Sequence, residues 1–158
     1  MIDDGFVTAH HEVSLNRLAF QATRHCLTGC AIGEILGLVI ATQLGWHDVA
    51  SIALAIVLAF AFGYALTLRP LLASGMTVQR AGRLAFASDT LSITVMEIVD
   101  NAIVVVVPGA MDAQITDGLF WGSLVVSLVM AGLAAFPVNR WLIARGQGHA
   151  LVHGDHDR

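Results

Sequence analysis

Long apolar segments separated by short polar ones form the pattern of this chain. Four stretches consist mostly of apolar side chains, and each is about 20 residues long, the length that a helix needs to cross a bilayer. They cover residues 25–44, 49–68, 88–107 and 119–136. We expect Arg69 and Pro70 to stop the second stretch, Pro108 and Gly109 the third, and Pro137 the fourth. The pattern predicts an all-α membrane protein with four transmembrane helices.

The arginines indicate how these helices are oriented. The chain has no lysine, and all its basic residues are arginines. They precede the first stretch, lie between the second and third, or follow the fourth: Arg17, Arg24, Arg69, Arg80, Arg83, Arg140, Arg145 and Arg158. The other two connections contain none. Because positive charge gathers in cytoplasmic segments, both termini and the second connection are predicted to be cytoplasmic.

Two further segments are predicted to be helical at the membrane surface. Residues 14–24 have an N-cap candidate in Ser14 and lead into the first span. Residues 77–88 place Arg80 and Arg83 on one face, which is typical of a short amphipathic cytoplasmic helix lying on the bilayer. The predicted domains are a cytoplasmic N-terminal segment with an amphipathic helix (1–24), a four-helix transmembrane domain (25–145) and a flexible cytoplasmic tail containing histidines (146–158).

Composition excludes several functional classes. Hydrophobic residues make up 56% of the chain and charged residues 13%, whereas soluble domains average about 25% charged residues. The net charge is −4, so no basic surface for nucleic acid is expected. No nucleophile elbow, phosphate-binding loop, HExxH or dinucleotide motif occurs. The sequence therefore predicts an integral membrane protein, with lipid as a partner and no enzymatic activity.

Acidic residues occur inside two of the apolar stretches. Glu34 and Glu97 each lie about nine residues into their spans, roughly 13 Å from the cytoplasmic end at 1.5 Å per residue. The two spans run in the same direction, so both carboxylates should lie at the same depth. Asp100 follows Glu97 by three positions, on the same face. The predicted ion pathway adds Asp89, Thr90, Thr94 and Asn101.

An acid at mid-membrane is costly, about 2.5–3.5 kcal/mol on the insertion scale. The third span carries two of them, so its acidic face must turn toward protein or water. Such acids by default mark ion or proton pathways. The alternative is a structural role, in which protonated acids hydrogen-bond between helices.

The thiols suggest a metal site. Cys26 and Cys30 are four residues apart, on one helix face near the cytoplasmic surface, and His25 is adjacent. Thiolate and imidazole suit copper(I) or zinc. Together with the acids, the predicted metal ligands are His25, Cys26, Cys30, Glu34, Glu97 and Asp100. Two alternatives remain: small buried packing residues, or a redox pair, which this helical spacing disfavours.

Glycines recur at every fourth position on the first span, at Gly29, Gly33 and Gly37. Small residues at this spacing let another helix approach closely. We expect a packing surface there, which brings the third span or a second copy of the first span against the thiols and Glu34.

Three strings resemble a known family. They are HCLTGCAIGEILGLVIA, SDTLSITVMEIVDN and FPVNRWLIARGQGH. They resemble a family of bacterial integral membrane proteins, domain of unknown function 4396, over about residues 20–150. The resemblance implies a four-span domain in the bacterial inner membrane and supplies no activity.

The leading hypothesis is a small membrane protein that binds or transports a transition-metal cation such as copper or zinc. The ion would bind first to the thiols and the imidazole near the cytoplasmic surface, and would then reach the carboxylates at the middle of the membrane. Four helices leave little room for a pathway, so a homo-oligomer is expected. The alternatives are a structural or assembly subunit without transport, a thiol-redox protein, and a proton or alkali-cation pathway through the acids.

Overall fold

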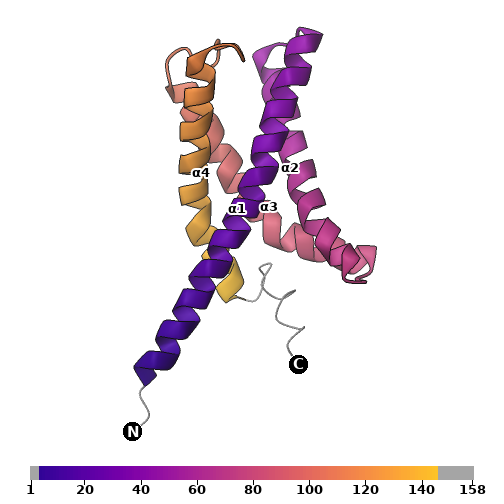
Figure 1. The fold of residues 1–158 in the computed structure, drawn as a ribbon. Coiled ribbons are helices and arrows are strands. Elements are labelled where there is room, and N and C mark those ends of the chain that lie inside the picture. Colours follow the sequence, from indigo (N-terminus) through magenta and orange to yellow (C-terminus); the bar gives the residue numbers. More distant parts are fainter. Residues whose placement is uncertain (1–3, 146–158) are drawn as a thin grey trace.

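The computed structural model describes the backbone of residues 4–145 and the side chains of residues 15–47 and 49–145. The predicted histidine-containing tail, residues 146–158, lies outside this part. The described chain is all-helical, with four helices joined by short connections (Figure 1). These are α1 (Asp4–Leu44), α2 (Asp48–Ala73), α3 (Val78–Val106) and α4 (Gly118–Ala144).

Three of the described helices are long and apolar enough to cross a membrane, judged by length and composition. They comprise Leu15–Leu44, Val49–Ala73 and Gly118–Ala144. The remaining helix, α3, is 29 residues long, so its length would also suffice. It differs in composition, because Asp89, Glu97 and Asp100 interrupt its apolar residues.

Two prolines do not end their helices, contrary to the prediction. Pro70 lies inside α2 and Pro137 inside α4. Each proline removes only one backbone hydrogen bond of its helix. α2 ends at Ala73, and Gly75 just beyond it has a positive φ of 83° and a backbone N–H that bonds to Leu72 O at 3.0 Å. A glycine in this left-handed conformation closes the helix, which proline alone does not do.

The two predicted surface segments are parts of longer helices. Ser14 lies inside α1, which begins at Asp4, so its predicted N-cap role is wrong. Residues 78–88 are helical as predicted, but they form the first part of α3 rather than a separate helix. Nothing interrupts the backbone there, since no proline occurs between residues 78 and 106.

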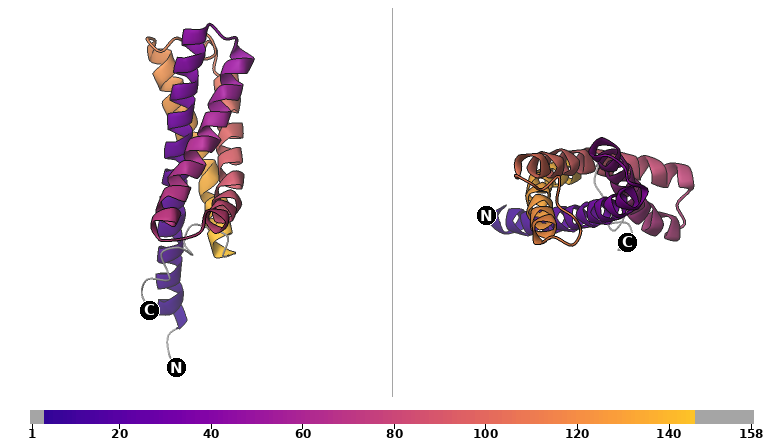
Figure 2. Two further views of the ribbon diagram at one scale, coloured as in Figure 1. Left: turned by 90° about the vertical axis from the view of Figure 1, so that its right-hand side faces the viewer. Right: turned by 90° about the horizontal axis from the view of Figure 1, so that it is seen from above.

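The four helices pack as an antiparallel bundle. α1 contacts all three other helices, α2 and α4 both contact α3, and Figure 2 shows this arrangement from the side and from above. The start of α1, the end of α4 and the connection between α2 and α3 lie at one end of the bundle (Figure 1). We call this the terminal end. The connections from α1 to α2 and from α3 to α4 lie at the other, which we call the loop end.

The glycine stripe on α1 faces small residues on α2 at the same spacing: Ala55, Ala59 and Gly63. A Cβ on Gly29 would lie 2.7 Å from Gly63 Cα, and a Cβ on Gly37 would lie 2.6 Å from Ala55 Cα. Neither gap would admit a methyl group. The partner of the stripe is therefore α2, and not the third span or a second copy, because only small residues opposite the glycines let the backbones approach this closely.

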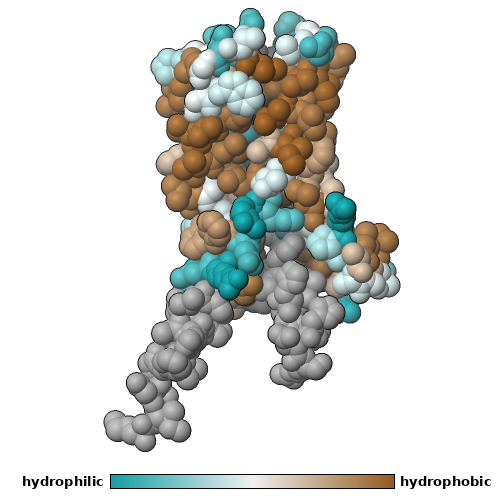
Figure 3. Space-filling view, in the orientation of Figure 1, coloured by the Kyte–Doolittle hydropathy of each residue, from teal (hydrophilic) through white to brown (hydrophobic). Residues whose placement is uncertain are grey.

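Apolar side chains cover the outside of the bundle as well as its centre. Val57, Val105 and Leu133 are each more than 60% exposed. Figure 3 shows a broad apolar band over the helices, with polar side chains gathered toward the terminal end. A surface of this extent is suited to contact with lipid.

Candidate functional site

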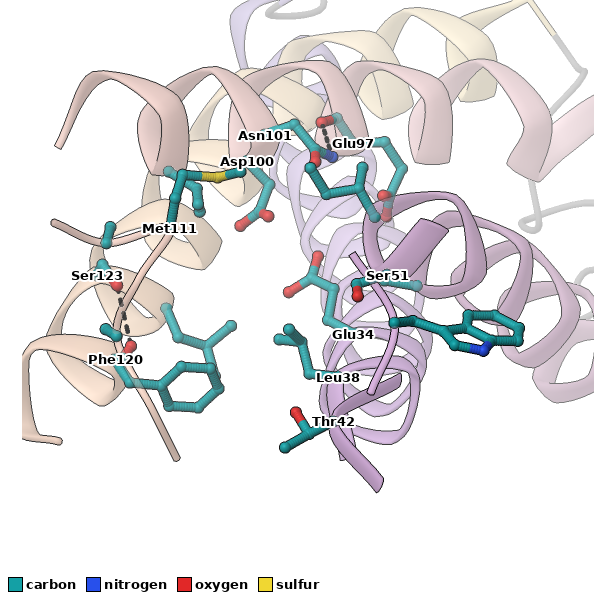
Figure 4. Close-up of a pocket in the computed structure, with 17 residues that line it drawn as sticks. Glu34, Leu38, Thr42, Ser51, Glu97, Asp100, Asn101, Met111, Phe120 and Ser123 are labelled. Atoms are coloured by element: carbon teal, nitrogen blue, oxygen red, sulfur yellow. Dashed lines mark hydrogen bonds between the residues drawn. The ribbon is translucent and has the colours of Figure 1, made fainter. Parts of the chain in front are cut away.

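A cavity of about 210 Å³ lies between the four helices in the loop-end half of the bundle. Its inner end is lined by Glu34 from α1 and by Glu97 and Asp100 from α3 (Figure 4). Ile52 from α2 and Phe120 from α4 line its sides. We call it the acid cavity. The structure thus brings together Glu34 and Glu97, which the sequence placed at one depth, and Asp100, three positions further along α3.

The carboxyl groups at this inner end are buried, and most of their oxygens lack a hydrogen-bond partner among the described residues. Glu34 and Glu97 are 5% exposed and Asp100 is 6% exposed. Among the described residues, neither oxygen of Glu34 or Glu97 has a hydrogen-bond partner, and Asp100 Oδ1 has none. Native proteins rarely leave such groups unsatisfied, since each costs about 1–3 kcal/mol. An arrangement of this kind is typical of a binding site.

All the titratable side chains that line this cavity are acids. Glu34 and Asp100 face each other across a short gap (Figure 4) and interact electrostatically, and Glu97 acts on both. None of the described residues that line the cavity is basic. Once deprotonated, these carboxyl groups favour a positively charged ligand.

Most of the predicted ion pathway lies elsewhere. Asn101 lines the cavity, but its Nδ2 donates to Glu97 O at 2.8 Å. Thr94 Oγ1 donates to Thr90 O at 2.7 Å, and the Thr90 hydroxyl lies 2.8 Å from Tyr64 OH. Asp89 lies closer to the terminal end than the acid cavity does. Only Asn101 of these four residues is thus part of the acid cavity.

A second polar cluster occupies the terminal-end half of the bundle. It comprises His25, Thr67, Ser88 and Asp89, and we call it the histidine cluster. His25 Nε2 lies 3.2 Å from Thr67 Oγ1, and Ser88 Oγ donates to Asp89 Oδ1 at 2.8 Å. Asp89 also interacts electrostatically with His25. Thr67 is fully buried and Asp89 is 2% exposed, so these groups bond mainly to one another.

The two cysteines lie in the apolar core. Both thiols are free and at most 3% exposed, and Cys30 Sγ lies 4.0 Å from Met96 Sδ. His25 contacts Thr67 on α2. Within the described part of the chain, no group of three or more His, Cys, Asp or Glu side chains is arranged to hold a metal ion. The structure therefore does not assemble the six predicted metal ligands into one site.

An apolar layer separates the two polar regions. Ile93 and Met96 lie between Asp89 and Glu97 on α3, and both are at most 1% exposed. They pack in one cluster with Cys30 and with small residues of α2 and α4. The acid cavity is therefore closed toward the terminal end.

Sequence reasoning missed several buried polar residues. Ser127 on α4 is fully buried and interacts with Asp100, and Thr67 completes the histidine cluster. Asn139 Nδ2 donates to Thr23 Oγ1 at 2.9 Å. The available signal was weak, because single hydroxyl or amide side chains in apolar helices often bond to their own backbone.

The chain matches one family over residues 15–148, described as "Domain of unknown function (DUF4396)". The match covers most of the sequence, so the chain belongs to this family. No curated protein matches the chain, and no solved structure does.

Proposed function

We propose that this member of the DUF4396 family is a four-span membrane carrier for a small cation, which it binds in the acid cavity and exchanges for protons. The supporting observation is the set of three buried carboxyl groups at the inner end of that cavity, most of whose oxygens have no hydrogen-bond partner among the described residues. Acids inside membrane helices commonly serve as ion sites or proton relays.

The proposal requires α3 to be the fourth span. Its 29 residues extend about 44 Å at 1.5 Å per residue, enough for the hydrocarbon core. Its acids face the bundle interior, whereas Leu91, Ile98 and Val105 are 44%, 64% and 66% exposed. The outward face of α3 is thus apolar, and the cost of its acids is reduced by burial against protein.

The proposed orientation places the termini in the cytoplasm of a bacterial cell, in its inner membrane. The support is the arginine distribution, since Arg69, Arg80 and Arg83 lie near the connection between α2 and α3, and Arg17 and Arg140 lie toward the start of α1 and the end of α4. The acid cavity then lies in the outer half of the membrane. The cation would enter from the side opposite the cytoplasm.

The geometry supports binding of a cation in the acid cavity better than binding of copper or zinc by the two thiols. Cys26 and Cys30 are buried in the apolar core, and His25 bonds to Thr67 instead of joining them. Metal capture by these three residues would need the core to open. Neither thiol chemistry nor a metal is required for the carboxyl groups to bind a cation.

The apolar layer favours a carrier over a channel. A cation leaving the acid cavity toward the cytoplasm must pass Cys30, Ile93 and Met96, which are tightly packed. Passage then requires the helices to rearrange, and transport should be slow and saturable. One chain lines the whole cavity, so an oligomer, although still predicted, is not needed to complete it.

The test is proton movement in vesicles that contain the purified full chain and a pH-sensitive dye. Gradients of sodium, potassium and tetramethylammonium chloride are applied in turn. We expect saturable proton movement with at least one cation, and a loss of tenfold or more in Glu97→Gln. Asp112→Asn, an equivalent change at an exposed acid, is the control.

The structural alternative predicts a different result. In a subunit whose acids only hold helices together, no gradient would move protons, and Glu97→Gln would alter only thermal stability or oligomer size. That outcome would overturn the proposal. Size-exclusion chromatography of each variant shows whether it is folded.

A further inference from the structure

The walls of the acid cavity differ sharply from its inner end. Beyond the carboxyl groups, the lining is mainly apolar: Leu38, Ile52, Val104, Met111, Phe120 and Leu124. Two of the polar side chains among these walls bond to nearby backbone oxygens. Ser51 Oγ donates to His47 O at 3.1 Å, and Ser123 Oγ donates to Phe120 O at 3.0 Å. The cavity thus has carboxyl groups at its inner end and mainly apolar sides.

A cavity with carboxyl groups at one end and apolar walls suits one class of cation better than the others. Calcium and magnesium require about six or more oxygen ligands in a shell around the ion, and a hydrated alkali ion gains nothing from apolar walls. The described side chains form no such shell. An organic ammonium ion carries both required parts, a charged head and an apolar body.

We propose that the ligand of the acid cavity is a small organic ammonium ion. Its charged head lies among Glu34, Glu97 and Asp100, and its apolar body lies against Leu38 and Phe120. This inference rests on the proposed function, because it names the class of cation that the same cavity takes.

Size and aromatic character both support this class. A cavity of about 210 Å³ has the volume of about seven water molecules at roughly 30 Å³ each, which admits a head group with a short alkyl chain. The Phe120 ring faces Leu38 and Thr42 across the cavity (Figure 4) and is itself 7% exposed. Aromatic rings attract ammonium groups and also bury alkyl chains.

The test is calorimetric binding to the full chain in detergent. The probes are methyl-, propyl- and butylammonium, tetramethylammonium, sodium, and 1-butanol as the neutral counterpart of butylammonium. We expect affinity to rise about fourfold for each added CH₂ until the cavity is filled, which is the factor for burying one methylene. Butanol should bind at least tenfold more weakly than butylammonium.

Variants then assign the binding to the cavity. Asp100→Asn should weaken butylammonium binding by tenfold or more, and Phe120→Leu should reduce the dependence on chain length. Asp112→Asn, outside the cavity, should leave both unchanged. Because the probe series is measured on the unaltered chain, the inference can be judged even where a variant does not fold.

The opposing outcomes separate this inference from the proposed function. Binding of sodium without any alkylammonium would overturn the ammonium ligand and leave a cation carrier in place. Butanol binding as tightly as butylammonium would overturn it as well, by showing that the carboxyl groups contribute nothing. Absence of binding by every cation, together with absence of proton movement in vesicles, would overturn both.

Discussion

The acid cavity and the histidine cluster are two polar regions in the core of one helix bundle, yet they are built differently. In the histidine cluster, His25 meets Thr67, and Asp89 accepts a hydrogen bond from Ser88. In the acid cavity, the carboxyl groups of Glu34 and Glu97 have no hydrogen-bond partner among the described residues. Hydrogen bonds join the side chains of the first region, whereas the carboxyl groups of the second border a cavity.

This difference shows how one type of side chain can have two roles in a membrane helix. Asp89 and Asp100 lie on the same face of α3, eleven positions apart, and both are buried. Their surroundings differ, since Asp89 packs in the closed half of the bundle and Asp100 lines a cavity. Burial alone therefore does not identify a functional acid; the partners and the neighbouring space do.

The largest expected effect is on cation binding. The double variant Glu34→Gln/Asp100→Asn removes two of the three carboxyl groups that line the acid cavity. We expect cation affinity, measured by calorimetry, to fall by at least a hundredfold. The thermal unfolding midpoint should stay the same or rise, because the substitutions remove charge repulsion from a buried site. A fall in stability with unchanged affinity would show that the acids are structural after all.

The next effect concerns the apolar layer between the two regions. Met96→Ala should leave a cavity beside Cys30 and lower the free energy of unfolding by about 2–4 kcal/mol. We also expect a several-fold faster passive proton leak in vesicles, because the layer that closes the acid cavity is thinned. Leu133→Ala, an exposed site on α4, is the control. A leak equal to that of the control would contradict the barrier role.

A smaller effect is expected in the histidine cluster. Thr67→Val keeps the shape of the side chain but removes the hydroxyl that contacts His25. The free energy of unfolding should fall by about 1–3 kcal/mol, the cost of unsatisfied buried groups. Cation affinity should change less than twofold. Thr116→Val, on the exposed connection before α4, is the matched control. A large loss of cation affinity in Thr67→Val would show that the histidine cluster and the acid cavity act as one site.

The smallest effect is expected at the thiols. Since Cys26 and Cys30 are buried at 3% and 1% exposure, a maleimide reagent should label them only slowly in the folded protein and quickly after unfolding. Elemental analysis by plasma mass spectrometry should give the same copper and zinc content for the unaltered chain and for Cys26→Ser/Cys30→Ser. Stoichiometric metal that is lost in the variant would restore the transition-metal hypothesis.

Particular residues show where sequence reasoning succeeded and where it did not. The equal depth of Glu34 and Glu97 followed from counting residues along two spans that run in the same direction, and the structure does place both at one cavity. A metal site of His25, Cys26 and Cys30 stays a prediction, since no ligand group of this kind is assembled among the described residues. His25 turns toward Thr67 on α2, while Cys26 enters the core, and that choice depends on how the helices pack.

The sequence by itself determined the local features of this protein: the helical segments, their apolar faces and the positions of the acids along them. These follow from composition and periodicity, which act within one helix. Only the tertiary structure decided that the glycine stripe faces α2, that Ile93 and Met96 separate two polar regions, and that a cavity remains beside three carboxyl groups. These features depend on the fit between side chains of different helices, which no single segment encodes.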